Sequence, residues 1–409
     1  MRELFYLTFK SIQNRKITFS LSVISIAISV ILLLGVDKAV KSSKSHFINT
    51  INSTDIIVAS SNGSLDILLN LIFHLSDPLK EMSYKSFEDI KKFDELKWAV
   101  PLSLGDSFQG FDVVSTDKNY FKYYRYSSGK TLQFSHGRAF IDFYDVVIGS
   151  EIAKKLHLKV GDTIYLSHGK HHHKHIHKNR IFNVVGVLKQ SMTPNDESLF
   201  MQLKADEAIH IEWQSGHFID MHISSEKLSH MGIKPKHISG MLIGLKNRSS
   251  ILSMEEKINH YKEENLKAVI PAKALSKLYK LMKNFQDILM IISSAVFIAS
   301  IFTMLSSMFS TLNERRREIA IFRSLGASSK TVFLLFMIES FLVAFSGIVI
   351  GVIMIDILGY FVPFKLSFGL DIYQFFMLFS MLVIAVIASF FPALKSYKNS
   401  LSDGLLVRM

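Results

Sequence analysis

The sequence predicts a membrane protein of four transmembrane helices, with a large extracytoplasmic α+β domain between the first and the second helix. Three observations support this fold class. The 409-residue chain is 49% hydrophobic with a positive mean hydropathy, which is typical of a protein partly solvated by lipid. Its apolar residues gather in four long segments. Its lysines and arginines near those segments lie mainly on one side of the membrane.

Each of the four segments is long enough to cross a bilayer. Residues 17–36 contain no charged side chain, and at about 1.5 Å per residue they span a hydrocarbon core of roughly 30 Å. The other segments are residues 288–312, 332–358 and 372–393, all rich in Leu, Ile, Phe and Met. A cleavable signal peptide is the alternative for the first segment. No small-residue cleavage site follows Val36, so a retained helix is the preferred interpretation.

Basic residues predict the orientation of these helices. Lysines and arginines gather in the amphipathic N-terminal segment 1–16, in the connection 313–331 and in the tail 394–409, whereas the connection 359–371 offers only Lys365. Because basic loops stay in the cytoplasm, both termini and the connection 313–331 are expected there. Residues 37–287 then lie outside the membrane on the other side.

The outside segment shows both helix and strand patterns. The stretch "DVVIGSEIAKKLHLKVGDTIYLS" predicts a strand, a helix from about Ser150, a turn and a second strand, and "RIFNVVGVLKQ" and "STDIIVAS" predict further strands. "ISGMLIGLK", "SMEEKINHYKEE" and "KAVIPAK" predict a β-α-β unit, and "SFEDIKKF" predicts a helix capped by Ser86 and Asp89. The last helix, "ALSKLYKLMKNFQDI", runs into the second crossing without Gly or Pro, so force can pass along it.

A histidine-rich stretch, "SHGKHHHKHIHKNR", lies between the strands "TIYLS" and "RIFNVV" and is the predicted tip of a β-hairpin. Neutral imidazoles bind zinc and other divalent metals, so its histidines are the candidate metal ligands. A solvated tip, however, offers several competing ligand sets without fixed geometry. We therefore favour a polar loop that binds metal adventitiously over a metal sensor or buffer. The candidate ligands are His168, His171, His172, His173, His175 and His177.

The sequence gives no indication of an enzyme or of a cofactor bound by this chain. "SSGKT" at residues 127–131 resembles the end of a phosphate-binding loop, but the position of the first glycine is Tyr124, so a turn is expected. We find no nucleophile elbow, no H-E-x-x-H helix and no cysteine. The formal charge of +12 does not predict a nucleic-acid partner, because the cytoplasmic basic residues have a topological explanation.

Two acids lie in the third crossing. Glu339, in its second or third turn, is the candidate intramembrane polar residue, since acids in a membrane helix are often functional. The alternative is a hydrogen bond to a neighbouring helix. Asp356 lies near the outer end, where water can reach it. Because no chain of acids crosses the membrane, a proton relay is not expected.

The stretch "NERRREIAIFRSLGASSKTVFLLFMIESFLVAFSGIVIGV" resembles the loop and third helix of FtsX-like permeases of ABC transporters, the mechanotransmission group that includes the membrane parts of MacB and LolCDE. The resemblance extends to "FKSIQNRKITFSLSVISIAI" and "VVIGSEIAKKLHLKVGDTIYLS". It also includes "FNVVGVL" and "FPALKSYKNSLSDGLLVRM". It covers most of the chain in the right order.

The resemblance implies a permease in the bacterial cytoplasmic (inner) membrane that transmits mechanical work. The implied partners are a separate cytoplasmic ABC ATPase that binds ATP and magnesium, a second permease copy that is identical or related, an extracytoplasmic adaptor or substrate protein, and membrane lipids. A short helix at residues 313–325 would contact the ATPase, with a plain basic anchor as the alternative. Its contact residues would be Glu314, Arg315, Arg317, Glu318, Ile321 and Phe322, with Gly326 as the C-terminal stop.

Two functions follow as hypotheses. The first is a permease subunit that couples ATP hydrolysis in its partner to movement of the extracytoplasmic domain, for export or extraction of a lipoprotein, a peptide or another hydrophobic substrate. The competing hypothesis is a non-transporting signalling protein that regulates an extracytoplasmic hydrolase or senses metal through the histidine-rich loop.

Overall fold

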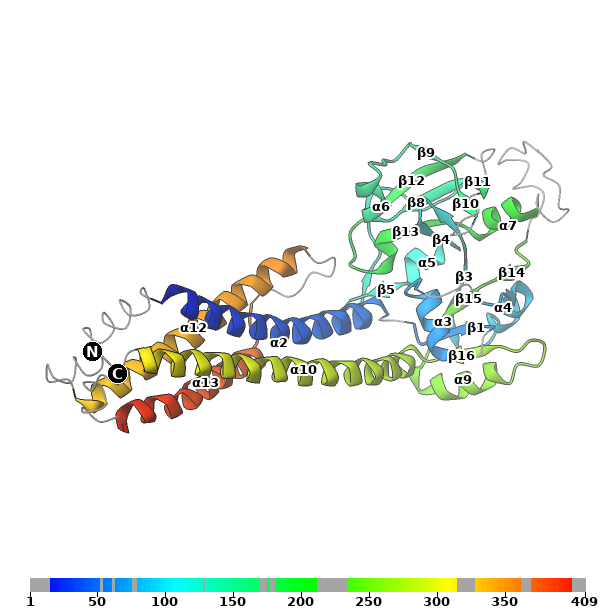
Figure 1. The fold of residues 1–409 in the computed structure, drawn as a ribbon. Helices are drawn as coiled ribbons and strands as arrows, with labels where there is room; N and C mark the ends of the chain where they lie inside the picture. The colour runs from blue at the N-terminus through cyan, green and yellow to red at the C-terminus, as the bar shows by residue number, and fades with distance from the viewer. Residues whose placement is uncertain are drawn as a thin grey trace. The chain divides into compact units, whose positions relative to one another are not determined.

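The structure, a computed structural model, describes residues 15–51, 54–60, 63–75, 79–127, 129–168, 175–176, 181–211, 234–314, 328–361 and 369–398. The chain divides into two compact units (Figure 1). One unit is Lys44–Lys280, called the domain below. The other combines Met1–Ser43 with Leu281–Met409 and is called the bundle.

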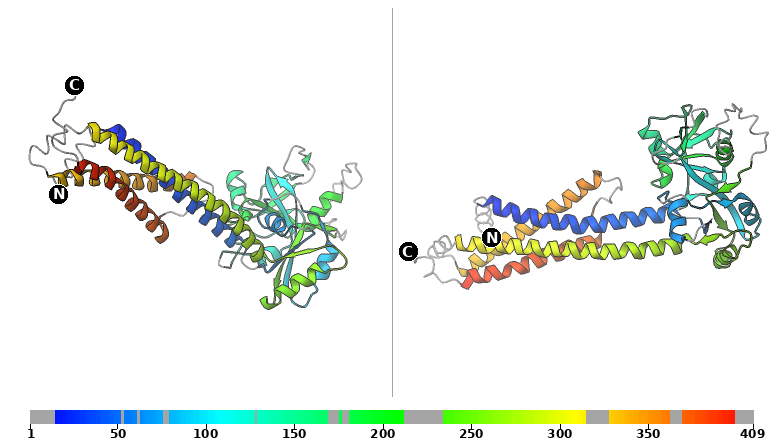
Figure 2. Two further views of the ribbon diagram at one scale, coloured as in Figure 1. Left: turned by 60° about the horizontal axis from the view of Figure 1, so that its bottom comes forward. Right: turned by 45° about the vertical axis from the view of Figure 1, so that its right-hand side comes forward.

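Among its described residues, the bundle contains four helices that are long and apolar enough to cross a membrane (Figures 1 and 2). These helices are α2 (Lys16–Thr50), α10 (Pro271–Glu314), α12 (Ser329–Phe361) and α13 (Ile372–Lys398). The domain, built on a large mixed sheet, is inserted between α2 and α10. The predicted fold class is therefore confirmed.

α2 and α10 are longer than the apolar segments that predicted them. α2 continues through the polar residues 37–50, and α10 begins at Pro271, well before the apolar stretch at 288. Neither extension contains a glycine or an internal proline, and proline suits the first turn of a helix. Each helix therefore has its remote end within the domain, as the sequence predicted for α10.

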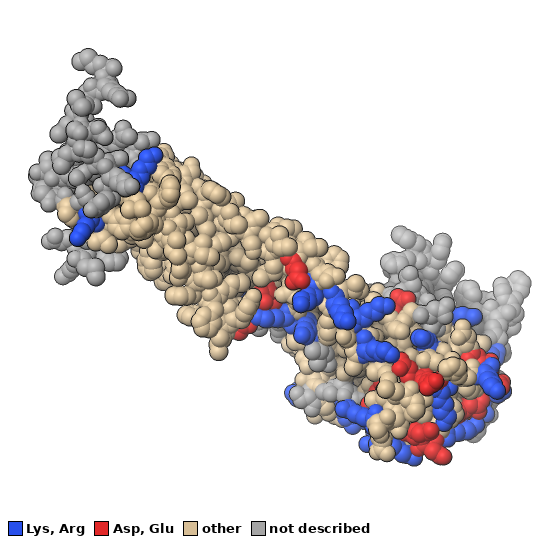
Figure 3. Space-filling view, turned by 90° about the horizontal axis from the view of Figure 1, so that it is seen from below, with Lys and Arg blue, Asp and Glu red and all other residues tan. Residues whose placement is uncertain are grey.

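Residues from all four helices share one core in the bundle. They include Ile26 of α2, Met304 of α10, Phe336 of α12 and Ala385 of α13, all at most 1% exposed. Large apolar side chains also cover the outside of the bundle, and Figure 3 shows no charged residue over its middle. Such an apolar exterior is expected where lipid replaces water.

Two glycines allow α12 to approach α2 closely. A Cβ atom added to Gly351 would lie 2.7 Å from Val30 Cβ and 3.0 Å from the Ala27 carbonyl oxygen, and one added to Gly347 would lie 2.8 Å from Ile26 Cβ. Small residues at this spacing commonly bring membrane helices together. The contact leaves no room for any larger side chain.

We predict that Gly351→Ala destabilises the bundle by about 1–3 kcal/mol, because the added methyl group overlaps α2. Thermal unfolding of the purified protein in detergent would measure this loss. Gly35→Ala is the matched control, since its Cβ atom would meet only Ile355 Cδ1, at an ordinary 3.4 Å. Equal unfolding temperatures for the two variants would contradict the prediction.

The domain is built on a sheet of strand order β16-β1-β15-β3-β4-β13-β8-β12-β7. The pairs β12–β8 and β13–β4 are parallel, and the other pairs along this path are antiparallel. The path comprises β1 (Ile56–Ala59), β3 (Leu96–Phe108), β4 (Phe111–Thr116), β7 (Phe134–Gly137), β8 (Asp145–Ile148), β12 (Phe182–Leu188), β13 (Ser198–Gln202), β15 (Gly240–Leu245) and β16 (Lys267–Val269).

Shorter strands and helices complete the domain. The short strands are β2 (Met82–Ser83), β5 (Arg125–Tyr126), β6 (Lys130–Thr131), β9 (Thr163–Ile164), β10 (Ser167–His168), β11 (His175–Ile176) and β14 (His237–Ile238). The helices are α3 (Ser64–Leu71), α4 (Tyr84–Ile90), α5 (Asn119–Tyr123), α6 (Ser150–Lys155), α7 (Leu203–Ile211) and α9 (Ile251–Asn259), with 3-10 turns η1 (Pro194–Glu197) and η2 (Arg248–Ser250). The strands and helices predicted around Ile56, Ser150, Phe182 and Met241 are confirmed.

Alternation along the strands places a core on each face of the sheet. In β1, Ile57 joins one core and Ile56 and Val58 join the opposite one, because successive side chains point to opposite faces. In β13, Phe200 joins the first core. The core that contains Ile57 and Phe200, called the long core, thus covers one face from β16 to β12, while separate cores cover the other face.

The predicted cap of α4 is wrong. Ser83 caps this helix by accepting a hydrogen bond from the Lys85 amide at 3.2 Å, whereas Ser86 is buried and donates to Glu264 Oε2 at 2.6 Å. Asp89 pairs with Lys92 instead. Glu264, which accepts the hydrogen bond from Ser86, is far from α4 in the sequence. A local pattern therefore could not predict this contact.

Candidate functional site in the membrane bundle

Most residues predicted to contact an ATPase lie outside the described part of the chain. Glu314 is the last residue of α10. The described residues resume at Ser328, so Arg315, Arg317, Glu318, Ile321, Phe322 and Gly326 fall between the two. The interface assigned to them stays a prediction.

The histidine-rich stretch is a hairpin in the part that the structure describes. β10 and β11 pair antiparallel, with His168 opposite His175, and β9 pairs with β12. His171, His172, His173 and His177 lie outside the described residues. Within the described ranges, no three acidic or histidine side chains come together as a metal site. The predicted hairpin is confirmed, and its metal ligation stays a prediction.

The "SSGKT" segment is a turn, as predicted. β5 ends just before it and pairs with β6, which is formed by its last two residues, and both Ser127 and Gly129 have positive φ angles, of 50° and 92°. Positive φ values are typical of tight turns, and the turn is followed by β6 and not by the helix that a phosphate-binding loop opens.

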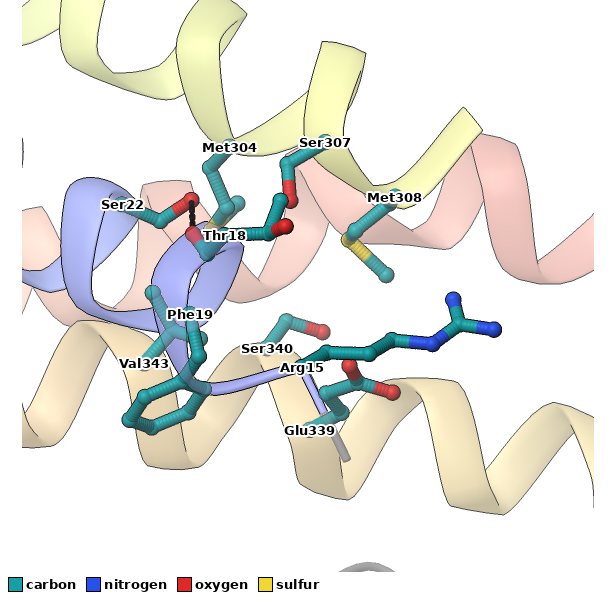
Figure 4. A pocket seen from close by; sticks show the side chains of 10 residues that line it. All are labelled: Arg15, Thr18, Phe19, Ser22, Met304, Ser307, Met308, Glu339, Ser340 and Val343. Carbon is teal, nitrogen blue, oxygen red and sulfur yellow. Dashed lines mark hydrogen bonds between the residues drawn. The ribbon is translucent and has the colours of Figure 1, made fainter. Parts of the chain in front are cut away.

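Glu339 lines a small pocket between three helices (Figure 4). The pocket has a volume of about 20 Å³, which is room for one water molecule. Besides Glu339, it is lined by Arg15, Thr18, Phe19, Ser22, Met304, Ser307, Met308, Ser340 and Val343.

The pocket places Glu339 against protein and not against lipid. Hydroxyl groups and the cationic Arg15 side chain line the same space, which is the setting in which an acid is tolerated within a membrane. Ser22 and Ser340 donate to backbone carbonyls of their own helices, at 3.2 and 2.6 Å. Residues 340–355 of α12 contain no further acid, so no acidic side chain of this helix could relay a proton between Glu339 and Asp356.

The other end of α12 carries a cluster of charged residues that joins α2, α12 and α13. Lys38 donates to Asp356 at 2.6 Å, and the Lys38 side chain is only 1% exposed. Lys41 donates to both Asp37 and Asp371 at 2.7 Å. We call these residues, together with Gln374, the ion-pair cluster.

Gln374 completes the ion-pair cluster from α13. Its Nε2 atom donates to Asp37 at 2.8 Å, and its backbone amide donates to Asp371 Oδ1 at 2.8 Å. The hydrogen bond from Lys41 holds the pKa of Asp371 below its usual range, so this carboxylate stays ionised at neutral pH. α2 is therefore bound to the start of α13 as well as to α12.

Sequence reasoning found only part of this cluster. Asp356 was recognised as a polar residue near the end of the third crossing, but its partner Lys38 lies 318 residues away along the chain. The one local signal was the spacing of Asp37 and Lys41, which are four residues apart on one helix face.

We predict that Asp356→Asn destabilises the bundle by about 3 kcal/mol, because it leaves the buried Lys38 ammonium without a counter-charge. Chemical or thermal unfolding in detergent would measure the loss. The double variant Lys38→Met with Asp356→Leu should recover most of it, since apolar side chains of similar size replace a buried ion pair at little cost. A double variant as unstable as Asp356→Asn would refute this account.

Within the domain, the ends of α2 and α10 lead to neighbouring strands. β1 follows α2 in the sequence, and α10 follows β16 after the single residue Ile270. β1 and β16 are paired directly, with Ile57 opposite Val269. Ala274 and Leu275 of α10 lie in the long core, and Phe47 of α2 packs against it. The helix ends are thus part of the folded domain.

Two protein-family models match the chain. The model of the MacB-like periplasmic core domain matches residues 19–261, which is more than half of the chain, and that of the FtsX-like permease C-terminal domain matches residues 290–401. One similar protein is the lipoprotein-releasing system transmembrane protein LolC of Buchnera aphidicola subsp. Schizaphis graminum (strain Sg). It is 23% identical over 355 residues, which are 84% of this chain and 79% of that protein.

Two solved structures are similar to part of the chain. The periplasmic region of MacB from Actinobacillus actinomycetemcomitans gives a TM-score of 0.35 at 12% identity and covers 57% of this chain and 95% of that one. The extracellular domain of the ABC-type transporter YknZ from Gram-positive bacteria gives 0.31 at 12% identity and covers 53% and 100%.

The two family models agree with the two main features of the described structure. These features are the sheet domain inserted after the first helix and the set of four helices that could cross a membrane. The chain therefore belongs to the family of permeases with a MacB-like periplasmic core domain and an FtsX-like C-terminal domain, and it is an inner-membrane ABC-transporter permease of the MacB and LolC type.

Proposed function

We propose that this permease couples ATP hydrolysis by a separate cytoplasmic ATPase to movement of its extracytoplasmic domain, for export or extraction of a lipoprotein, a peptide or another hydrophobic substrate. The observation that carries the proposal is the continuity of α2 and α10, each of which is a single helix from its apolar span to its polar end in the domain, with only Ile270 between β16 and α10. A displacement of α10 would reach β16 across the single residue Ile270, whereas residues 51–55 lie between α2 and β1.

The lengths of the two helices support this coupling. The 35 residues of α2 and the 44 residues of α10 correspond to about 50 and 65 Å, whereas the hydrocarbon core measures roughly 30 Å. Both helices therefore have a long part outside the lipid. A hydrogen-bonded helix is stiff along its axis, so it suits the transfer of a push or a pull.

The proposed partners follow from the same arrangement. The cytoplasmic ATPase would contact residues 313–325, which connect α10 to α12, and a second permease copy would complete the transporter. The basic residues of the N-terminal segment, of the connection and of the tail place all three in the cytoplasm in this proposal. The competing hypothesis of a non-transporting signalling protein is not favoured by membership of a transporter family.

We predict that Glu314→Arg combined with Ile321→Asp weakens co-purification with the ATPase and uncouples ATP hydrolysis from transport. A central interface residue commonly contributes more than about 1 kcal/mol, and Glu314, Arg317 and Ile321 would share one face of the predicted helix 313–325. Pull-down of the ATPase and ATP-dependent release of substrate from reconstituted vesicles are the measurements. Lys330→Glu, an exposed change outside the predicted contact residues 313–325, is the control.

Full activity of the double variant would exclude this interface. Transport activity in cells without any ATPase would exclude the coupling itself, and it would favour the signalling hypothesis.

We also propose that the histidine hairpin binds zinc or a similar divalent metal without taking part in transport. The pairing of β10 with β11 supports this proposal, because it brings His168 and His175 to opposite positions of one ladder. Residues at opposite positions of antiparallel strands are direct neighbours across the ladder, which is why we assign both to one candidate site.

Replacing all six histidines of the hairpin by serine should abolish most zinc binding to the detergent-solubilised permease, as measured by calorimetry. Transport should persist, since residues at a hairpin tip bury little surface. Replacing His136 and His157, which lie outside the hairpin, is the control for the loss of histidines elsewhere in the domain. Loss of transport in an assembled complex would show that the metal has a functional role.

A further inference from the structure

The C-terminal end of α2 is held by a segment from a different part of the domain. The last four carbonyl groups of a helix have no partner within the helix and need one elsewhere. The Asn49 carbonyl accepts a hydrogen bond from the Ser127 amide at 2.6 Å, and the Thr50 carbonyl accepts one from the Tyr124 hydroxyl at 2.7 Å. Thr50 is the last residue of α2, so Tyr124 and Ser127 cap this helix.

Tyr124 is placed for this contact by its own surroundings. It follows α5 directly, and its extended backbone ends that helix. The side chain is 4% exposed and lies in the long core. Burial raises the pKa of the Tyr124 phenol, which therefore stays protonated and able to donate.

Aromatic and polar contacts connect Tyr124 with β13. Its ring stacks on that of Tyr120, with the ring centres 5.0 Å apart, and the Tyr120 ring lies 5.4 Å from that of Phe200 in β13. The Tyr120 hydroxyl donates to Asn195 Oδ1 at 2.7 Å, in the turn that leads into β13. All of these side chains are buried, so a closely packed path joins the end of α2 to β13.

α2 is therefore attached to the sheet at two separate places. β1, which follows α2, lies beside the edge strand β16, whereas β13 lies farther into the sheet, beyond β15, β3 and β4. α10, in contrast, leads directly from β16. Unequal movements of α2 and α10 would reach different strands.

From this geometry we infer that Tyr124 is a positioning residue for energy coupling: it transmits displacement of α2 to the part of the domain formed by β4, β13, β8 and β12. The inference rests on the proposed coupling function and adds the residue through which the movement enters this part of the sheet. Tyr124→Phe removes the bond to α2 and leaves the ring in place, so it separates the hydrogen bond from the packing.

The test measures movement directly in the complete complex with its ATPase. The chain contains no cysteine, so spin labels can be attached at Lys159→Cys, between α6 and β9, and at Ser380→Cys on α13, both at exposed positions. The labelled permease is diluted with unlabelled permease in lipid nanodiscs. The distance between the labels is then measured by pulsed electron resonance, without nucleotide and with trapped ATP.

We expect the distance to change on ATP trapping when Tyr124 is present, and the change to fall by roughly half or more in Tyr124→Phe, because the Thr50 carbonyl loses the hydrogen bond from the Tyr124 hydroxyl. ATPase activity should persist in that variant. Tyr165→Phe is the matched control, since this tyrosine is 45% exposed. Ser127→Gly is the conservative control, because glycine keeps the amide donor and favours the positive φ of that position. Both controls should retain the full change.

The outcomes separate the inference from the proposed function. If the protein with Tyr124 shows no ATP-dependent change, the proposed coupling fails. If it shows the change and Tyr124→Phe shows the same change, the coupling stands and the inference is overturned. Should Tyr124→Phe not assemble, Asn195→Ala breaks the next bond of the path while Thr50 keeps its cap; an undiminished change in that variant would also overturn the inference.

Discussion

The structure depends on the continuous backbone hydrogen bonding of α2 and α10. A peptide group without a partner in lipid costs on the order of several kcal/mol, so neither helix can break within the hydrocarbon region. Neither contains a glycine or an internal proline in its polar extension, so neither ends where water begins. Their remote ends therefore lie in the domain. The end of α2 accepts hydrogen bonds from Tyr124 and Ser127, and the strands next to the two helices in the sequence, β1 and β16, are paired with each other.

The contacts between α2 and its neighbouring helices differ along its length. Besides the apolar core, two kinds of contact lie along the middle of α2. Gly347 and Gly351 of α12 approach it closely, and the Ser29 hydroxyl lies 3.4 Å from that of Ser300. Such contacts are close but only weakly directional. The ion-pair cluster is strongly directional, and Lys38 and Asp356 cannot separate in a low-dielectric environment without a large electrostatic cost. α2 is thus held firmly to α12 and α13 at one end of its apolar span.

The sequence predicted those features that depend on local pattern. Apolar length predicted the four membrane helices, alternation predicted strands such as β1 and β12, and the lack of helix breakers predicted that α10 continues into the membrane. Features that depend on remote partners were missed. Lys38 and Asp356, Ser86 and Glu264, and Tyr124 and Thr50 are pairs of residues far apart in the chain, and no local spacing reveals which carboxylate or carbonyl each donor will meet. Glu339 was found because an acid within an apolar segment is conspicuous by itself.

Close packing explains why movement of the helix ends would not remain local in the proposed mechanism. Ala274 and Leu275 of α10, Tyr124 beside α2, and Phe200 of β13 all belong to the long core. Protein cores have few voids and low compressibility, so a displaced helix end must displace its neighbours. Since α10 follows β16 with a single intervening residue while α2 is also tied toward β13, a difference in movement between the two helices would tilt one part of the sheet relative to the other. In the proposed mechanism the sheet would be the element that converts axial movement of the helices into a change of the domain surface.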